Sequence, residues 1–379
     1  MDENKNGWSG EESPKPQDGQ VFINGEVQDI PKKTAWRPTQ NQIKIAAIAL
    51  VIAVLGVGGW FALQHTSPAK SPIATKKTAP KPTTVASNLT GLQVDPSVNQ
   101  RPVTGVMIEN SLEARPQSGL DQAGVVFEAI AEGGITRHLA LYQDSEPDYL
   151  GPVRSVRPYY AQWCMGFDCT IAHVGGSPEA LSNIQTWGVK DLDQFVHDAA
   201  YWRIPSRYAP HNMYTSTAKL REVQAAKGYS AGTFTPLARK ADAPSQTPNA
   251  RSININISSA SFNSHYDWDA ASNTYRRSLG GEPHMNVNSA GAAAQISPKV
   301  VVAMVMPYGV ALDKHSSYGT IGSGQAYVFQ DGIVTEGTWN KADMKTQFSF
   351  VDGAGKPIAL NAGQTWFVAL GGSGNLNYQ

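Results

Sequence analysis

Four arginines in the middle of the chain have side chains that could bind an anion. They are Arg115, Arg137, Arg154 and Arg157. A guanidinium group suits phosphate or carboxylate because it offers two parallel N–H donors to two oxygens. The same arginines could instead form structural ion pairs with nearby carboxylates, namely Glu109, Glu128, Glu132 and Asp144. Both interpretations, an anion site and internal ion pairs, stay open at this level.

A glycine loop near these arginines could offer backbone donors to the same anion. The loop Gly175–Ser177 follows a strand predicted over 170–174 and precedes a helix predicted from Pro178. Serine can cap such a helix, proline suits its first position, and glycines let a ligand approach exposed N–H groups. Capped helices in general share this pattern, so an ordinary helix start is the alternative.

Three histidines, His138, His173 and His211, lie near the same predicted sheet edge. A single histidine is more often a core or loop residue than a catalyst. The chain has no Gly-x-Ser-x-Gly elbow, phosphate-binding Walker loop, dinucleotide fingerprint or His-Glu-x-x-His motif, so no catalytic residue is assigned. The predicted anion-binding set is Arg115, Glu132, Arg137, His138, Arg154, Arg157, His173, Gly175, Gly176, Ser177, His211 and Asn212.

The two cysteines, Cys164 and Cys169, are too few for a structural zinc site, and we expect no metal and no cofactor. They either form a disulfide or pack as small buried hydrophobes. Acidic and basic residues are equal in number, 31 of each, which argues against a nucleic-acid-binding protein. Recognition of an anion would therefore have to be local.

The region 100–240 has the pattern of an α/β domain, a mixed sheet with helices. Apolar, β-branched runs predict strands over 102–108, 125–131 and 139–143. Helical spacing predicts helices over 156–165, 178–187 and 217–227.

The region 250–379 has the pattern of a β-rich α+β lobe, with Asp-Gly turn pairs at 331–332 and 352–353. Strands are predicted over 252–257, 264–269, 274–279, 299–306, 326–330, 334–339, 347–351 and 365–370. The segment 241–249 has no apolar period, so we expect a boundary there, with a separate core on each side.

The N-terminal region predicts a membrane anchor. Residues 1–42 are polar and have the composition of a disordered cytoplasmic tail. No residue is charged from Ile45 to Leu63, which predicts a transmembrane helix over 43–63, a signal-anchor; a cleaved signal peptide is the alternative. Residues 64–99 are rich in proline, threonine and lysine and predict a stalk. The globular part is then expected outside the cytoplasm.

Several motifs resemble the YerB-like bacterial lipoprotein family. They occupy residues 131–137, 151–158, 175–180, 210–214, 322–339 and 360–366. The resemblance covers about 100–372, and it implies an N-terminal and a C-terminal domain held outside the membrane, with no defined activity. This sequence lacks a lipobox cysteine, so we expect a spanning helix in place of the lipid.

The expected function is that of a membrane-anchored extracytoplasmic protein of the bacterial cell envelope. Its expected partners are the membrane, an anionic envelope glycan or lipid phosphate, or another protein. The alternative is an envelope enzyme, a phosphotransferase or hydrolase, that acts on a phosphorylated glycan or lipid carrier. The run Pro152-Val153-Arg154-Ser155 distantly resembles a motif of the LytR-CpsA-Psr phosphotransferases, although its aspartate is missing. Catalysis would require the arginines to converge with a histidine or carboxylate in a cleft.

Overall fold

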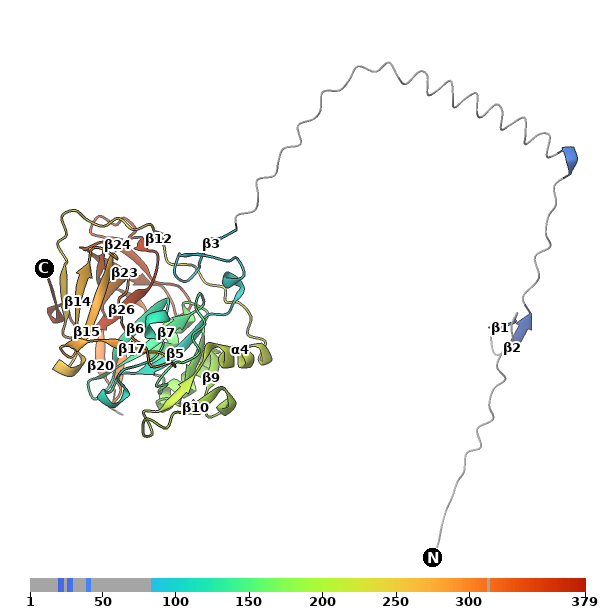
Figure 1. Ribbon diagram of the computed structural model, residues 1–379, viewed down its shortest axis with the longest axis horizontal. Coiled ribbons are helices and arrows are strands. Elements are labelled where there is room, and N and C mark those ends of the chain that lie inside the picture. The colour runs from blue at the N-terminus through green and yellow to red at the C-terminus, as the bar shows by residue number, and fades with distance from the viewer. Residues whose placement is uncertain (1–19, 24–25, 30–38, 42–82, 312–313) are drawn as a thin grey trace, which may run out of the picture. The chain divides into compact units, whose positions relative to one another are not determined.

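The computed structural model describes residues 20–23, 26–29, 39–41, 83–311 and 314–379 (Figure 1). The chain divides into two compact units, 1–79 and 80–379. The predicted spanning helix over 43–63 lies outside the described residues. Among the helices that are described, none has both the length and the apolar character needed to cross a bilayer.

In the first unit, β1 (Gln20–Ile23) pairs antiparallel with β2 (Glu26–Asp29). The sequence predicts a disordered tail here, so this strand pair departs from the expectation. Val21, Phe22 and Ile23 are residue types that favour strands, which accounts for the difference.

The second unit begins earlier than the sequence predicts. Part of the expected stalk over 64–99 is folded, because β3 (Val85–Ala86) pairs with β4 (Gln93–Val94). Leu89 between them is fully buried in a hydrophobic core. Hydrogen bonds add to this burial: Ser87 donates to Asp144 at 2.7 Å and Arg239 donates to the carbonyl of Leu89 at 2.7 Å. These contacts with the rest of the unit order a segment whose composition alone favours an extended chain.

A ten-stranded mixed sheet organises the second unit. Its order is β24-β23-β22-β19-β26-β6-β7-β5-β8-β9. The strands are β5 (Thr104–Glu109), β6 (Val125–Glu132), β7 (Ile135–Tyr142), β8 (Thr170–His173), β9 (Lys190–Asp193), β19 (Val300–Val305), β22 (Gly322–Gln330), β23 (Ile333–Lys341), β24 (Ser349–Asp352) and β26 (Thr365–Leu370).

The strand β26 joins the two halves of this sheet. It pairs in parallel with β6, where Phe367 lies opposite Phe127, and in parallel with β19 on its other side. All six residues of β26 are buried, so the strand needs a neighbour on each edge and cover on both faces. The expectation that 100–240 and 250–379 have separate cores is therefore wrong.

The first core lies on the face of the sheet covered by α2 (Pro158–Met165) and α3 (Pro178–Trp187). Phe127 stacks on Trp163 of α2 and on Phe367, with ring centroids 5.1 and 4.8 Å apart. The helix α2 begins at Pro158, two residues later than predicted, because proline favours the first helical position. The helix α4 (Thr217–Ala226) packs on the second core through Leu220.

The second core lies between the ten-stranded sheet and a five-stranded antiparallel sheet of order β16-β15-β14-β13-β27. Its strands are β13 (Ser252–Ile255), β14 (Ser264–Asp269), β15 (Thr274–Leu279), β16 (Glu282–Pro283) and β27 (Leu376–Tyr378). Short strand pairs complete the unit: β10 (Tyr201–Arg203) with β11 (Met213–Thr215), β12 (Arg239–Lys240) with β25 (Leu360–Asn361), β17 (Met285–Val287) with β18 (Ala293–Gln295), and β20 (Tyr308–Val310) with β21 (Ser316–Tyr318). The described residues are mostly β-sheet with few helices.

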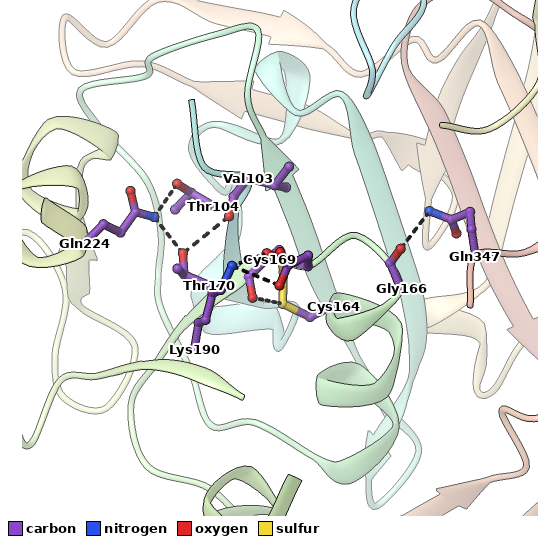
Figure 2. Close-up of a disulfide and its surroundings, with 10 residues drawn as sticks. Val103, Thr104, Cys164, Gly166, Cys169, Thr170, Lys190, Gln224 and Gln347 are labelled. Carbon is purple, nitrogen blue, oxygen red and sulfur yellow. Dashed lines mark hydrogen bonds and ion pairs between the residues drawn. A yellow bond between two sulfur atoms is a disulfide. The ribbon is translucent and has the colours of Figure 1, made fainter. Parts of the chain in front are cut away.

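A disulfide between Cys164 and Cys169 closes the turn from α2 into β8 (Figure 2). This settles the alternative that the sequence left open. Beside it, Gln224 of α4 donates hydrogen bonds to the hydroxyls of Thr104 and Thr170, at 2.8 and 2.6 Å. These bonds tie α4 to β5 and β8.

Candidate functional site

The predicted site residues gather mainly at one edge of the ten-stranded sheet. The strands β5, β6, β8 and β9 run in the same direction, because β5 and β6 both pair antiparallel with β7 and the others pair in parallel. Their carboxyl ends therefore meet at one edge. Ligands of open α/β sheets bind preferentially outside this edge.

At the end of β6, Glu132 holds two of the predicted arginines. Its carboxylate accepts a hydrogen bond from Nη2 of Arg137 at 2.8 Å and forms an ion pair with Arg157. Burial raises the pKa of Glu132, but the two guanidinium groups outweigh it and hold that pKa below its usual value.

Both of these arginines are buried and already bonded. Arg137 also donates to the carbonyl of Ser155 at 2.8 Å, and Arg157 donates to the carbonyl of Val156 at 2.8 Å. Burial lowers the pKa of Arg157, and the nearby charge of Arg137 lowers it further. We call Glu132, Arg137 and Arg157 the Glu132 group. Its arginines bind protein atoms, and these bonds fix the loop before α2 to the end of the sheet.

At the end of β5, Glu109 holds Arg154 and His211. Its Oε1 atom lies 3.3 Å from Nε of Arg154 and 2.9 Å from Nδ1 of His211. Ser111 donates from its hydroxyl to the same carboxylate oxygen at 3.2 Å. These four residues form the Glu109 cluster, in which Glu109 is buried while Arg154 and His211 are 27% and 23% exposed.

The backbone fixes Arg154 in place. Its N–H donates to the carbonyl of Met107 on β5, and its own carbonyl accepts from the N–H of Val174 after β8. Arg154 is thus wedged between two parallel strands at their carboxyl ends. Its guanidinium makes no hydrogen bond to any described residue: Nε, although 3.3 Å from Glu109, is a buried donor without a hydrogen-bond partner, and the two terminal nitrogens remain available to a ligand.

The Glu109 cluster is not a serine-hydrolase triad. In a triad the acid binds one ring nitrogen of histidine and the serine binds the other. Here Ser111 and Glu109 both contact Nδ1 of His211, at 3.2 and 2.9 Å. The Nε2 atom has no partner within the part of the chain that the structure describes.

Asn212 supports the loop that carries His211. Its side chain accepts from Arg203 at 2.6 Å and donates to the carbonyls of Ile204 and Arg207. It is buried and has a positioning role in this structure.

The loop after β8 uses its own donors internally. The N–H of Gly175 binds Asp193 at 3.0 Å, and that of Ser177 binds the carbonyl of Val156 at 3.4 Å. The side chain of Ser177 caps α3 through the N–H of Ala180. Between Gly175 and Ser177, Gly176 forms a backbone bridge with Val156. The carboxylate of Asp193 therefore already accepts the backbone N–H that was expected to bind an anion.

His173 is fully buried beneath this loop. Its two ring nitrogens lie 2.8 Å from the carbonyl of Gly175 and 2.8 Å from Asp191. It fixes the loop to β9 and has no access to solvent.

Arg115 and His138 lie apart from the others, toward the second core. His138 is fully buried beside Glu128 and edge-on to Trp366, and burial lowers its pKa. Arg115 donates to the side chain and carbonyl of Asn110, at 3.1 and 3.0 Å. The structure therefore divides the predicted set into three parts: the partly exposed Glu109 cluster, the buried arginines on Glu132 with the loop after β8, and Arg115 and His138 near the second core.

The second core contains an ion pair that the sequence analysis missed. Arg277 of β15 binds both oxygens of Glu128 at 2.9 Å, and both side chains are fully buried. Burial raises the pKa of Glu128, but Arg277 outweighs it and holds that pKa well below the usual range. A signal was present, because Arg277 alternates with the apolar Tyr275 and Leu279 on the inward face of a strand.

Comparison with known proteins places these residues in a family. Models of the "Protein of unknown function (DUF3048)" family match over 89–230 for the N-terminal domain and 253–367 for the C-terminal domain. The chain is 30% identical over 285 residues to the Bacillus subtilis (strain 168) protein YerB, provisionally named a lipoprotein, covering 73% of this chain and 84% of that protein.

A solved structure extends this similarity to the fold. The crystal structure of the YerB protein from Bacillus subtilis superposes with a TM-score of 0.70 at 27% identity. The match covers 78% of this chain and 99% of that chain. The chain therefore belongs to the YerB-like family, with its N-terminal and C-terminal DUF3048 domains.

Proposed function

We propose that the protein is an extracytoplasmic protein of the cell envelope that binds an anionic group at the Glu109 cluster. The observation that carries this proposal is the state of Arg154, a partly exposed arginine whose guanidinium makes no hydrogen bond to any described residue and meets Glu109 through an ion pair at 3.3 Å. The other arginines at this edge are bound to carboxylates and carbonyls.

The chemistry of the cluster fits a phosphate-like or carboxylate ligand. Arg154 offers two parallel donors, and Nε2 of His211 adds a third polar contact at the same edge. Glu109 lies behind both residues: it is hydrogen-bonded to Nδ1 of His211 and forms an ion pair with Arg154. Glu132, with the buried Arg137 and Arg157, fixes the loop before α2 and contributes to the site by position alone.

Three observations support the location outside the cytoplasm. The related YerB protein carries the name of a lipoprotein, which implies attachment to a membrane. The disulfide between Cys164 and Cys169 suits an oxidising compartment. The uncharged run from Ile45 to Leu63 has the length of a single spanning helix. We therefore propose a single-pass anchor with the folded unit outside.

The test is a titration of pyrophosphate against the wild-type chain and two variants. In Arg154→Ala the affinity should fall by roughly tenfold or more, since a charge-assisted hydrogen bond contributes about 1.5–3 kcal/mol. The matched control is Arg276→Ala, which removes an exposed arginine of β15 and should leave binding unchanged. Equal affinity in wild type and Arg154→Ala, with lower stability in the variant, would assign Arg154 a structural role instead.

One observation favours an enzyme as the second candidate. With Nδ1 of His211 bound to Glu109 at 2.9 Å, Nε2 is left as the open ring nitrogen, which is the arrangement of a carboxylate-oriented general base. Such a base beside Arg154 suits hydrolysis or transfer of a phosphorylated group. Hydrolysis of a chromogenic phosphodiester by wild type, lost in His211→Gln while pyrophosphate still binds, would support the enzyme over the binding protein.

A further inference from the structure

A cavity lies on the side of the second core. Its volume is about 410 Å³, within the range of small-molecule sites. Most of its wall is apolar and comes from the segment after β5 and from β15 to β17: Leu112, Pro116, Leu279, Pro283 and Met285. Leu112 is 58% exposed at this cavity, which leaves a large apolar side chain in water. The cavity shares no lining residue with the Glu109 cluster.

Arg115 also lines the cavity and adds a positive charge to its mostly apolar wall. Its guanidinium lies over the ring of Phe262 at 5.1 Å and donates twice to Asn110. Unlike Arg137, Arg154 and Arg157, it has no carboxylate within 4.0 Å in the described part of the chain. Burial lowers the pKa of Arg115 to about 10, which still leaves it charged at neutral pH. The nearest carboxylates that act on its charge, Glu128 and Glu113, lie beyond ion-pair distance. A half-buried cation that lacks a direct partner is costly, so an anion bound in contact with it would be favoured.

The histidine of the cavity adds no second charge. His284 accepts from Nε of Arg277 through Nδ1 at 2.9 Å, so its proton is on Nε2, which faces Gln117 at 3.0 Å. Burial, reinforced by the charge of Arg277, lowers the pKa of His284 well below its usual value. The charged side chains of the wall are thus Arg115 and the exposed Glu282 at β16.

We propose that this cavity binds an amphiphile, a molecule with one anionic head group and a short alkyl chain. The head group, a phosphate monoester or a carboxylate, pairs with the guanidinium of Arg115. The alkyl chain lies against Leu112, Leu279 and Met285 and removes apolar surface from water, chiefly that of the exposed Leu112. The proposal rests on this cavity alone and stands whether or not the Glu109 cluster binds an anion.

The test uses the full chain and four water-soluble probes, with binding followed by calorimetry. Hexyl phosphate should bind with one site per chain in Arg154→Ala, a variant in which the Glu109 cluster cannot add a second phosphate site. Hexanol, which lacks the charge, and inorganic phosphate, which lacks the chain, should each bind at least about tenfold more weakly. Hexanoate distinguishes the source of the head group, because it binds as well as hexyl phosphate only if a carboxylate is accepted.

Variants locate the binding. Arg115→Gln should weaken hexyl phosphate by about tenfold and leave hexanol unchanged, since it removes only the charge. Leu112→Ser changes an exposed side chain, so it should keep the fold and weaken both hexyl phosphate and hexanol. Glu282→Gln should strengthen hexyl phosphate, because it removes a like charge. The matched control Arg276→Ala should change neither ligand.

Three results would overturn the proposal. One is equal affinity for hexyl phosphate in wild type and Arg115→Gln, with Leu112→Ser also unchanged. The other is equal affinity of wild type for hexanol and hexyl phosphate, which would mean that Arg115 does not meet the head group. Loss of binding in Arg154→Ala but not in Arg115→Gln would assign the phosphate to the Glu109 cluster and would also contradict it.

Discussion

At the scale of single residues, the four arginines of the predicted site have three different roles. Arg137 and Arg157 are buried on Glu132, Arg154 keeps open donors beside Glu109, and Arg115 lies toward the second core. The sequence identified them as a group but could not separate them. Which carboxylate each one meets depends on the pairing of β5, β6 and β7 and on the path of the loop before α2, and neither is encoded in local spacing.

From the ion pairs of Glu132 we predict that the free energy of unfolding depends on pH in the acidic range. The pKa of Glu132 in the folded protein is below its value in the unfolded chain, about 4.3. Its contribution to the free energy of unfolding is therefore present above pH 4.3 and is lost as the pH falls through the folded-state pKa. In Glu132→Gln this part of the acid dependence should disappear.

The measurement is denaturant unfolding of wild type and Glu132→Gln between about pH 6 and pH 3. Glu222→Gln, which changes an exposed glutamate of α4, serves as the control and should follow wild type. If Glu132→Gln and wild type lose stability in parallel as the pH falls, the ion pairs of Glu132 do not stabilise the fold.

At the scale of elements, the sequence predicted α3 at its observed bounds, because both ends of the helix carry local signals. Ser177 caps it, Pro178 occupies its first position and Gly188 ends it in the left-handed conformation, at φ 66°. The role of the loop before it was not predictable. Asp193 accepts a hydrogen bond from the N–H of Gly175. It belongs to β9, a strand that follows α3 in the chain, so the sequence around the loop does not indicate this contact.

This assignment predicts that Ser177 acts on stability alone. Ser177→Ala should lower the free energy of unfolding by about 1 kcal/mol, the usual cost of losing a helix N-cap. It should leave pyrophosphate binding unchanged, since the hydroxyl is committed to the N–H of Ala180. Ser182→Ala, within the same helix, is the control for stability. A loss of pyrophosphate affinity in Ser177→Ala would return the loop to the list of ligand contacts.

At the scale of the whole molecule, the strands and helices of the folded part were largely predictable and their assembly was not. Hydrophobic period and turn residues mark segments such as 125–131 and 365–370 individually. The residues of these two segments do not indicate that the segments pair with each other, although more than half the chain separates them. That pairing joins β6 to β26. As a result, the two regions expected to be separate domains share one sheet and both hydrophobic cores.

One shared sheet predicts cooperative unfolding of the second unit. Hydrogen exchange at increasing denaturant should show the amides of β5 and β22 opening together, with one common free energy. These strands lie on opposite sides of the joint between β6 and β26. Opening of β5 at clearly lower denaturant than β22 would show that the two family domains unfold separately despite the shared sheet.

The central claim is that the Glu109 cluster binds an anion through Arg154. The most direct measurement is a crystal structure of the full chain grown with pyrophosphate, compared with one of Arg154→Ala under the same conditions. The account predicts pyrophosphate oxygens in hydrogen-bond contact with the terminal nitrogens of Arg154 and with Nε2 of His211 in wild type, and no ligand there in the variant. Pyrophosphate bound elsewhere in both crystals, with Arg154 still paired only to Glu109, would contradict it.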